Sequence, residues 1–195
     1  MKKSAATRLG ILQKAFELIY ANGYQATSID QIIATTQVTK GAFFYHFKSK
    51  DEMGISIINE VVKPAAINFI EPLKKEADSL DGIYNFIHNL LLKNDFLKVE
   101  YGCPVGNLAQ EMTPWNAEFN KAMNDITGLW TKAMIASIEK GKKNGLIHED
   151  INAKQVTLFV VSGYWGIRNF GKLDNSKKVY LPYLKELKNY LNTLK

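Results

Sequence analysis

Apolar side chains recur at intervals of three and four residues along most of this chain, which is the pattern of amphipathic helices. Residues 5–21 carry one such stripe, made of Leu9, Leu12, Phe16 and Ile19. Gly23 follows it, and glycine suits the left-handed conformation that ends many helices. Ser28 and Gln31 then fit a capping box, so a second, shorter helix is predicted to begin there.

A third helix is predicted for residues 39–47, where Thr39 is placed to cap the first turn. Phe43 and Phe47 lie four residues apart and therefore share one face, which can anchor the helix to a core. The opposite face consists of Gly41 and Tyr45, flanked by Ala42 and Phe44. Two short helices joined by a turn and backed by a first helix form a helix-turn-helix unit, the arrangement that reads the major groove of DNA.

A fourth helix is predicted to start at a second capping box, formed by Ser49 and Glu52. Its apolar residues are Met53, Ile57, Ile58 and Val61. Pro64 and Pro72 lack the backbone N–H that a helix interior needs, so each can kink or end this linking helix. The pattern leaves open whether residues 50–77 form one kinked helix or two.

The rest of the chain also has helical periodicity, in residues 80–97, 115–143, 156–167 and 180–194. The run Leu158-Phe159-Val160-Val161 is β-prone, but no hairpin partner flanks it, so a buried helix is preferred. We therefore predict an all-α fold of about nine helices in two domains. The boundaries are 5–65 for a helix-turn-helix domain that includes the start of the linking helix, and 66–195 for a larger helical domain.

The first quarter of the chain is basic. Residues 1–50 hold seven Lys or Arg and two acids, Glu17 and Asp30, a net charge of +5 out of +6 for all 195 residues. A concentrated basic segment favours a polyanionic partner such as nucleic acid. A merely solvated basic face is the alternative that charge alone leaves open.

Neither catalytic nor metal-binding patterns are apparent in the sequence. His46, His88 and His148 are scattered, and Cys103 is the single cysteine, so no nucleophile–base pair or set of metal ligands can be identified. We expect no enzymatic activity, no metal and no cofactor. The single thiol, the lack of a signal peptide and the lack of a long apolar run favour a cytoplasmic protein without a membrane partner.

The N-terminal segment resembles the signature of the tetracycline-repressor (TetR) family. The similar residues are Gly23-Tyr24, Thr27-Ser28-Ile29 and the run from Val38 to Glu52. The resemblance implies that the third helix docks in the major groove of double-stranded operator DNA. It assigns DNA contact to Thr39, Lys40, Gly41, Ala42, Phe44, Tyr45 and His46, and phosphate contact to Thr27, Ser28 and Lys50.

Two positions depart from the family pattern. Gln37 stands where the family often has glycine in the interhelical turn, at a position that can require a positive φ, so we expect backbone strain there. Phe44 stands where many members have tyrosine. We therefore expect Phe44 to contact a thymine methyl or a sugar instead of donating a hydrogen bond.

The resemblance also implies a homodimer formed through the last two helices. The implied interface consists of Ser162, Gly166, Tyr180, Leu184, Leu187 and Leu191. Ser162 and Gly166 place small residues four positions apart, which allows close approach of helices. The leucine seam that starts at Tyr180 has an alternative interpretation as internal core.

Aromatic residues of the larger domain are numerous enough to line an apolar ligand cavity, although such residues are more often plain core. The candidate contacts of a small-molecule effector are Cys103, Trp115, Phe119, Trp130, Phe159 and Tyr164. Cys103 carries a second hypothesis, because a thiol just before a helix start can react with electrophiles or oxidants. A buried structural cysteine is the alternative.

The combined prediction is a homodimeric, ligand-responsive transcriptional regulator, with a repressor released from its operator by a small molecule as the preferred form. An activator and a thiol-based sensor that uses Cys103 remain alternatives within the same family. An alternative of another class is a helical small-molecule binding or catalytic domain whose basic N-terminus contacts a different polyanion. The sequence names neither effector nor operator.

Overall fold

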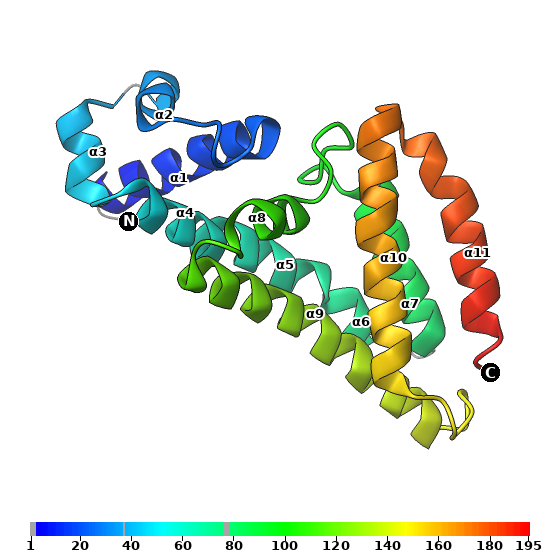
Figure 1. Cartoon of the computed structure of the whole chain (residues 1–195). Helices are drawn as coiled ribbons and strands as arrows, with labels where there is room; N and C mark the ends of the chain where they lie inside the picture. The colour runs from blue at the N-terminus through cyan, green and yellow to red at the C-terminus, as the bar shows by residue number, and fades with distance from the viewer. Residues whose placement is uncertain (1–2, 37, 76–78) are drawn as a thin grey trace. The chain divides into compact units, whose positions relative to one another are not determined.

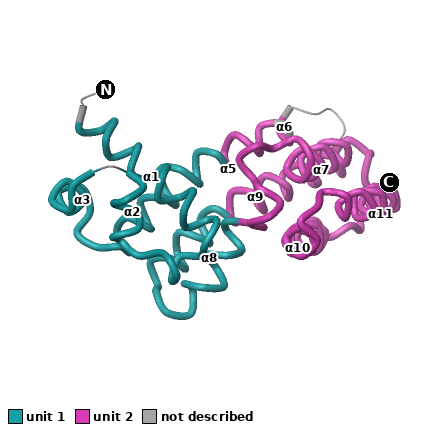
Figure 2. Tube along the Cα trace, turned by 90° about the horizontal axis from the view of Figure 1, so that it is seen from above, with its two compact units in different colours: residues 1–65, 104–126 teal, residues 66–103, 127–195 magenta. Residues whose placement is uncertain are grey.

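The computed structural model describes residues 3–36, 38–75 and 79–195, and every regular element within these ranges is helical. The all-α fold expected from the sequence is therefore confirmed. The chain divides into two compact units, which Figure 2 colours separately. Unit 1 consists of residues 1–65 and 104–126, and unit 2 consists of residues 66–103 and 127–195.

Unit 1 contains the helix-turn-helix segment, which is drawn in blue to cyan in Figure 1. Its helices are α1 (Lys3–Asn22), α2 (Ile29–Thr36) and α3 (Lys40–His46). Their buried apolar side chains include Ile11, Leu12, Phe16, Ile19, Ile32 and Phe43. Gly23 adopts φ +95° directly after α1, the left-handed conformation that the sequence indicated for this helix end.

The linking helix is one helical run as far as Phe69 and a separate short helix beyond it. α4 (Lys50–Ile57) continues into a π-helical turn, η1 (Ile58–Val62), and then into α5 (Lys63–Phe69). Pro64 lies in the first turn of α5, directly after the wider π turn, where its missing N–H interrupts no regular α-helical segment. Ile70 separates α5 from α6 (Glu71–Lys75), whose first turn contains Pro72.

Two helices from the middle of the chain complete unit 1. α8 (Pro104–Met112) begins with a proline, which is well placed there because the first helical N–H has no partner within the helix. α9 (Ala117–Lys143) starts in unit 1 and continues into unit 2. Residues 104–126 thus pack with the N-terminal segment through buried residues such as Phe119. The functional division into 5–65 and 66–195 remains a prediction.

Unit 2 is built from helices that share an aromatic core. Its elements include α7 (Ser79–His88) with a π-helical end, η2 (Asn89–Lys93), α10 (Ala153–Asp174), a 3-10 turn η3 (Lys177–Val179) and α11 (Tyr180–Asn192). α10 includes the β-prone run and is helical. The ring of Trp130 meets those of Phe86 and Tyr164 edge-on, at centroid distances of 5.2 and 5.6 Å.

Glycines allow α10 and α11 to approach each other. A Cβ on Gly163 would lie 2.8 Å from the hydroxyl oxygen of Tyr183, and one on Gly171 would overlap the ring of Tyr180. Gly163 and Gly171 therefore provide the close approach within the protomer. Ser162 and Gly166, which were expected to allow close approach at the dimer interface, are exposed in the protomer, and that role remains a prediction.

A buried arginine ties the segment before α8 to α10. Arg168 is fully buried and donates to the carbonyl oxygens of Lys98 (2.6 Å) and Gly102 and to the hydroxyl of Tyr180 (3.2 Å). Because the guanidinium bridges two carbonyls of one loop, it fixes the conformation of the residues that lead to Cys103.

Candidate nucleic-acid interface

A cap and two buried rings hold α3 in place. The Thr39 hydroxyl oxygen accepts a hydrogen bond from the Ala42 N–H at 3.1 Å, as the sequence predicted. Phe43 and Phe47 are 0% and 1% exposed, and the guanidinium of Arg8 from α1 lies 4.9 Å from the centroid of the Phe47 ring. The buried face of α3 is therefore fixed, and this determines which residues face outward.

The outer face of α3 is open to solvent. Tyr45 is 78% exposed and Phe44 is 43% exposed, while Lys40 and Gly41 are also exposed. Ala42 and His46 are half-buried. A Cβ on Gly41 would meet nothing nearer than the Thr39 hydroxyl oxygen at 4.0 Å, so internal packing does not require glycine there. Glycine costs about 1 kcal/mol of helix stability relative to alanine, and close approach of another molecule at Gly41 remains a prediction that would account for it.

Lys40 is available to an external anion. Its ammonium lies 3.4 Å from the carboxylate of Asp30, but both side chains are mostly exposed. Exposed ion pairs of this kind contribute about 0–1 kcal/mol, so a phosphate can replace the carboxylate at small cost.

The two residues predicted to contact phosphate before α2 have different roles. Ser28 is exposed and forms a complete capping box with Gln31, with distances of 2.7 and 3.2 Å. Thr27 is 1% exposed, and its hydroxyl donates to the carbonyl oxygen of Gly23 at 2.7 Å. The Thr27 side chain therefore stabilises the turn after α1, which corrects its expected contact with a phosphate.

Lys50 is partly enclosed at the start of α4. Its ammonium donates to the carbonyl oxygen of Tyr24 at 2.6 Å and lies 4.4 Å from the centroid of the Tyr24 ring. Burial lowers the pKa of Lys50, while the carboxylates of Asp51 and Glu111 favour its charged form. An ammonium has three donors, so one bond to Tyr24 leaves capacity for a phosphate as well.

The Ser49 cap of the predicted α4 capping box is present, whereas the reciprocal bond of Glu52 is to Lys48, the residue before the cap. The Ser49 hydroxyl accepts from the Glu52 N–H at 3.0 Å, and the Glu52 carboxylate accepts from the Lys48 N–H at 2.8 Å. Gln37, where backbone strain was predicted, lies outside the described residues.

The six candidate effector contacts are distributed over both units. Trp130 and Tyr164 are buried together in the core of unit 2, and Cys103 is also buried there, at 4% exposure. Phe119 belongs to the core of unit 1. Trp115 and Phe159 are 82% and 60% exposed. The pair that the structure brings together is thus Trp130 and Tyr164, and effector contact by any of the six remains a prediction.

The six candidate interface residues are also divided. Tyr180, Leu184, Leu187 and Leu191 of α11 are at most 4% exposed within the protomer, which corresponds to the internal seam considered as the alternative. Their spacing is explained by packing against neighbouring helices, so these side chains have almost no surface left for a partner subunit. Ser162 and Gly166 lie on the exposed face of α10.

The exposed face of α10 carries an apolar patch that the sequence analysis missed. We call the α10 patch the exposed α10 side chains Leu158, Phe159, Phe170 and Leu173, with exposures between 59% and 80%. The signal was present in the spacing of Leu158, Ser162, Gly166 and Phe170, which recur every four residues. The small residues in the middle of that row hid it.

Four other residues were assigned no role from the sequence, namely Tyr24, Asp51, Glu111 and Asn116. The Tyr24 hydroxyl donates to Asp51 at 2.6 Å, and the Glu111 carboxylate accepts from the Gln25 N–H at 2.9 Å. Burial and the hydrogen bond to Asp51 raise the pKa of Tyr24, so the phenol remains a donor at neutral pH. Glu111 lies far along the chain from Gln25, and no local pattern predicts such a pairing.

The described residues lack two features, a membrane-spanning helix and a metal-binding cluster. None of their helices is long and apolar enough to cross a membrane. Within the same part of the chain, no three His, Cys, Asp or Glu side chains are grouped in a way that could hold a metal ion.

Two family profiles match this chain. The profile described as "Bacterial regulatory proteins, tetR family" matches residues 11–56, which contain the helix-turn-helix segment. The profile described as "Tetracyclin repressor-like, C-terminal domain" matches residues 80–183. The second match alone spans more than half of the chain.

Individual proteins agree with these profiles. An uncharacterized HTH-type transcriptional regulator of Lactococcus lactis subsp. lactis is 34% identical over 128 residues, which cover 62% of each chain. The HTH-type transcriptional repressor DhaR of Mycobacterium sp. (strain GP1) is 22% identical over 172 residues, 88% of this chain and 85% of that one. The solved structure of a cysteine mutant of CifR, a TetR-family regulator complexed with 26-base-pair double-stranded operator DNA, has the same fold. It has a TM-score of 0.80 and 15% identity, and the match covers 92% of this chain and 93% of that one.

Proposed function

The chain belongs to the TetR family of bacterial transcriptional regulators, and from this premise we propose that it is a homodimeric repressor that a small molecule releases from its operator. Each protomer places α3 in the major groove of one half-site. The observation that carries the proposal is the outward face of α3, where exposed Lys40, Gly41, Phe44 and Tyr45 are presented by a helix whose cap and buried rings fix its orientation.

The groups on and beside this face have two roles, because some set the position of the protein on the DNA and others read the base sequence. Lys40 and the capped N-termini of α2 and α4 contact the sugar–phosphate backbone, which sets the register of the protein on the duplex. Phe44 and Tyr45 lie toward the groove floor, where Phe44 has no polar atom and selects for apolar contact such as a thymine methyl. DhaR is named a repressor and the CifR mutant was solved with operator DNA, which supports repression through operator binding.

Dimerisation is proposed to use the α10 patch. Its four exposed apolar side chains, together with Ser162 and Gly166, share one face of α10 by their helical spacing. Burial of such a face against its own copy stabilises a two-fold dimer through the hydrophobic effect, and the small residues in its centre permit close helix contact. Two-fold symmetry of the protein then requires two symmetric half-sites in the DNA.

The effector is proposed to bind noncovalently in the larger domain. Trp130 and Tyr164 supply aromatic surface and a phenolic hydroxyl, which suit a largely apolar molecule with a polar group. The burial of Cys103 favours the structural role of this thiol over a sensor role. Release follows if the effector binds more tightly to a dimer state whose two α3 helices no longer match the half-sites.

A footprint on the DNA beside the protein's own gene tests this proposal. A protected, two-fold symmetric sequence that resists competition by unrelated DNA is the expected result. Retention on DNA and on heparin with no protected sequence would instead favour a helical binding or catalytic domain with a generally polyanion-binding N-terminus.

A further inference from the structure

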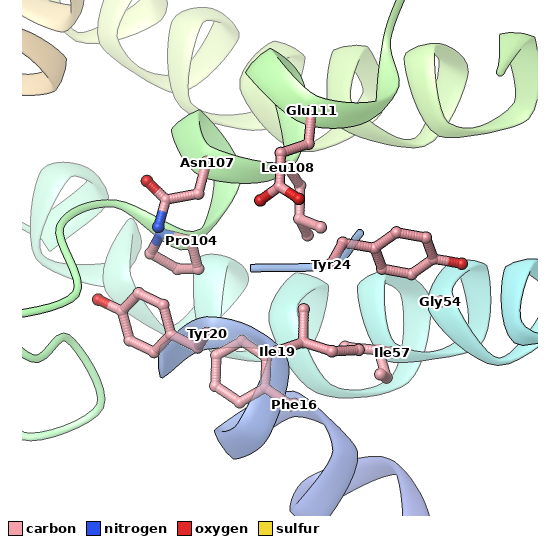
Figure 3. A pocket seen from close by; sticks show the side chains of 10 residues that line it. All are labelled: Phe16, Ile19, Tyr20, Tyr24, Gly54, Ile57, Pro104, Asn107, Leu108 and Glu111. Carbon is pink, nitrogen blue, oxygen red and sulfur yellow. The ribbon is translucent and has the colours of Figure 1, made fainter. Parts of the chain in front are cut away.

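The turn after α1 is contacted by a segment from the middle of the chain. We call this segment the α8–α9 corner, residues 111–116. Its first contact is Glu111, whose carboxylate oxygen accepts the Gln25 backbone N–H at 2.9 Å. Gly23 makes room for this contact, since a Cβ there would lie 3.1 Å from the other Glu111 oxygen. Figure 3 shows Glu111 and Leu108 of α8 directed toward Tyr24.

A second contact from the corner reaches the start of α4. The side-chain amide of Asn116 donates to one oxygen of Asp51 at 3.2 Å, and the Tyr24 hydroxyl donates to the other oxygen at 2.6 Å. The Tyr24 ring packs edge-on against Phe119 at 5.0 Å. A Cβ on Gly54 would lie 2.6 Å from Phe119 and 2.7 Å from Tyr24, so only glycine allows these two rings to lie against α4.

The space behind these contacts is too small for an effector. The pocket in Figure 3, lined by residues such as Phe16, Tyr20, Ile57, Pro104 and Leu108, encloses about 10 Å³. That is about the space of one water molecule, whereas sites for drug-sized ligands measure about 300–1,000 Å³. α8 is therefore seated directly on α1 and α4, and a movement of the corner is transmitted to the groups it touches.

The groups that the corner touches lead directly to the DNA-contact candidates. Gln25 lies three residues before Ser28, the cap of α2, and Asp51 follows Lys50 in the first turn of α4. Lys50 donates in turn to the Tyr24 carbonyl at 2.6 Å. The segments that begin α2 and α4 are thus both positioned by Tyr24. The corner in turn contacts Gln25, which follows Tyr24, and Asp51, to which Tyr24 is bonded.

We propose that Glu111 and Asn116 are positioning residues for operator binding, which touch no DNA but set the place of Ser28 and Lys50 through Gln25, Tyr24 and Asp51. This inference rests on the proposed operator binding. α8 follows Cys103 directly in the chain, and α9 continues to Trp130. The corner therefore lies in the chain between two of the candidate effector residues, Cys103 and Trp130, and in space it contacts the segments that begin α2 and α4.

The test compares full-length variants for operator affinity, measured by fluorescence anisotropy over a series of salt concentrations. Glu111→Ala and Asn116→Ala should each weaken binding by about 5- to 20-fold, at the low end of couplings between sites. The salt slope should stay that of the wild type, because no phosphate-binding group is removed. Glu111→Gln keeps an acceptor for the Gln25 N–H and should restore most of the affinity. Gln110→Ala and Glu118→Ala, at exposed neighbouring positions, are the matched controls.

Two further measurements distinguish a positioning role in operator binding from a role in folding alone. Stoichiometric titration gives the active fraction of each variant, so an affinity loss that merely reflects unfolded protein overturns the proposal. In a double-mutant cycle, Glu111→Ala combined with Ser28→Ala should lose less than the product of the single effects, whereas Glu111→Ala with Lys40→Ala should be multiplicative. Equal behaviour of the two pairs contradicts the proposal.

Hydrogen exchange tests the contact in the unmodified protein. Operator DNA should slow exchange of the Gln25 amide, because it stabilises the arrangement in which that amide is bonded to Glu111. Unchanged exchange, or unchanged affinity in both alanine variants of a wild type that binds its operator, overturns this inference alone. A wild type without sequence-specific binding overturns the proposed function and the inference together.

Discussion

The hydroxyl of Tyr24, in the turn after α1, donates a 2.6 Å hydrogen bond to the carboxylate of Asp51 in the first turn of α4. This bond joins the two chain segments from which phosphate contacts are expected. It also places the buried phenol of Tyr24, 2% exposed, against the Asp51 carboxylate, whose other oxygen accepts a hydrogen bond from the Asn116 amide.

Tyr24→Phe should remove this bond without changing the packing of the ring. We expect a loss of about 1 kcal/mol in the free energy of unfolding, the usual contribution of one hydrogen bond, because Asp51 is itself exposed to water. Urea unfolding followed by circular dichroism measures it. Tyr45→Phe, at a phenol that is 78% exposed, serves as the control and should leave stability unchanged. Equal stability of the wild type and Tyr24→Phe would show that the bond contributes nothing net.

Lys40→Ala and Lys50→Ala should differ in their effect on stability. Lys40 is expected to contact phosphate only, whereas Lys50 is expected to contact phosphate and also to stabilise the fold. Each should reduce the salt slope of operator binding by about 0.9 for each phosphate that the protein no longer neutralises, or about 1.8 for a dimer. Lys50→Ala should also lower the free energy of unfolding by about 0.5–1.5 kcal/mol, because it removes the donor to the Tyr24 carbonyl. Lys132→Ala, at an exposed position of α9, is the control. A slope that is unchanged in both variants rules out their assignment to phosphates.

The α10 patch and the α11 seam should respond differently to substitution. Leu173→Glu places a charge on a side chain that is 80% exposed in the protomer, so it should leave the fold intact and give monomers in sedimentation analysis. Leu187→Ala creates a cavity at a position 4% exposed and should cost about 2–5 kcal/mol of stability. Lys172→Glu, beside Leu173, is the control for added negative charge. Dimers that persist in Leu173→Glu would move the interface elsewhere.

Alkaline pH should destabilise the contact between α10 and α11 through Tyr183. Burial raises the pKa of Tyr183 to about 12, above the 10.0 of an exposed tyrosine. Below pH 10 the phenol is protonated in both the folded and the unfolded chain, and its contribution is complete. Between these two pKa values the unfolded chain ionises first, so the stabilisation is lost as pH rises.

The measurement for Tyr183 is urea unfolding at about pH 9 and about pH 11, on either side of the ordinary tyrosine pKa. The wild type should lose more free energy of unfolding between these two conditions than Tyr183→Phe does. Parallel losses in the two proteins would mean that Tyr183 titrates normally.

The sequence predicted those parts of the fold that depend on local patterns. Helix starts followed from the caps at Thr39 and Ser49, and the orientation of α3 followed from the spacing of Phe43 and Phe47. Both are properties of a few consecutive residues, which periodicity and capping chemistry determine.

Contacts between distant segments could not be predicted in the same way. The seam that begins at Tyr180 has the same spacing whether it faces a partner subunit or the protomer's own core, and only the packed structure shows that it is buried. Thr27 could be interpreted as a phosphate contact because a threonine before a helix suits either role. The pairing of Glu111 with the Gln25 N–H depends on how α8 packs, for which a single sequence carries no signal.

We propose that the two α3 helices of one dimer read a symmetric DNA sequence. Selection of bound molecules from random double-stranded DNA, followed by sequencing, tests it most directly. We expect enrichment of one two-fold symmetric site whose half-sites are centred about one helical turn apart, or a small multiple of it. Enrichment of no sequence, or of a site without two-fold symmetry, would contradict it.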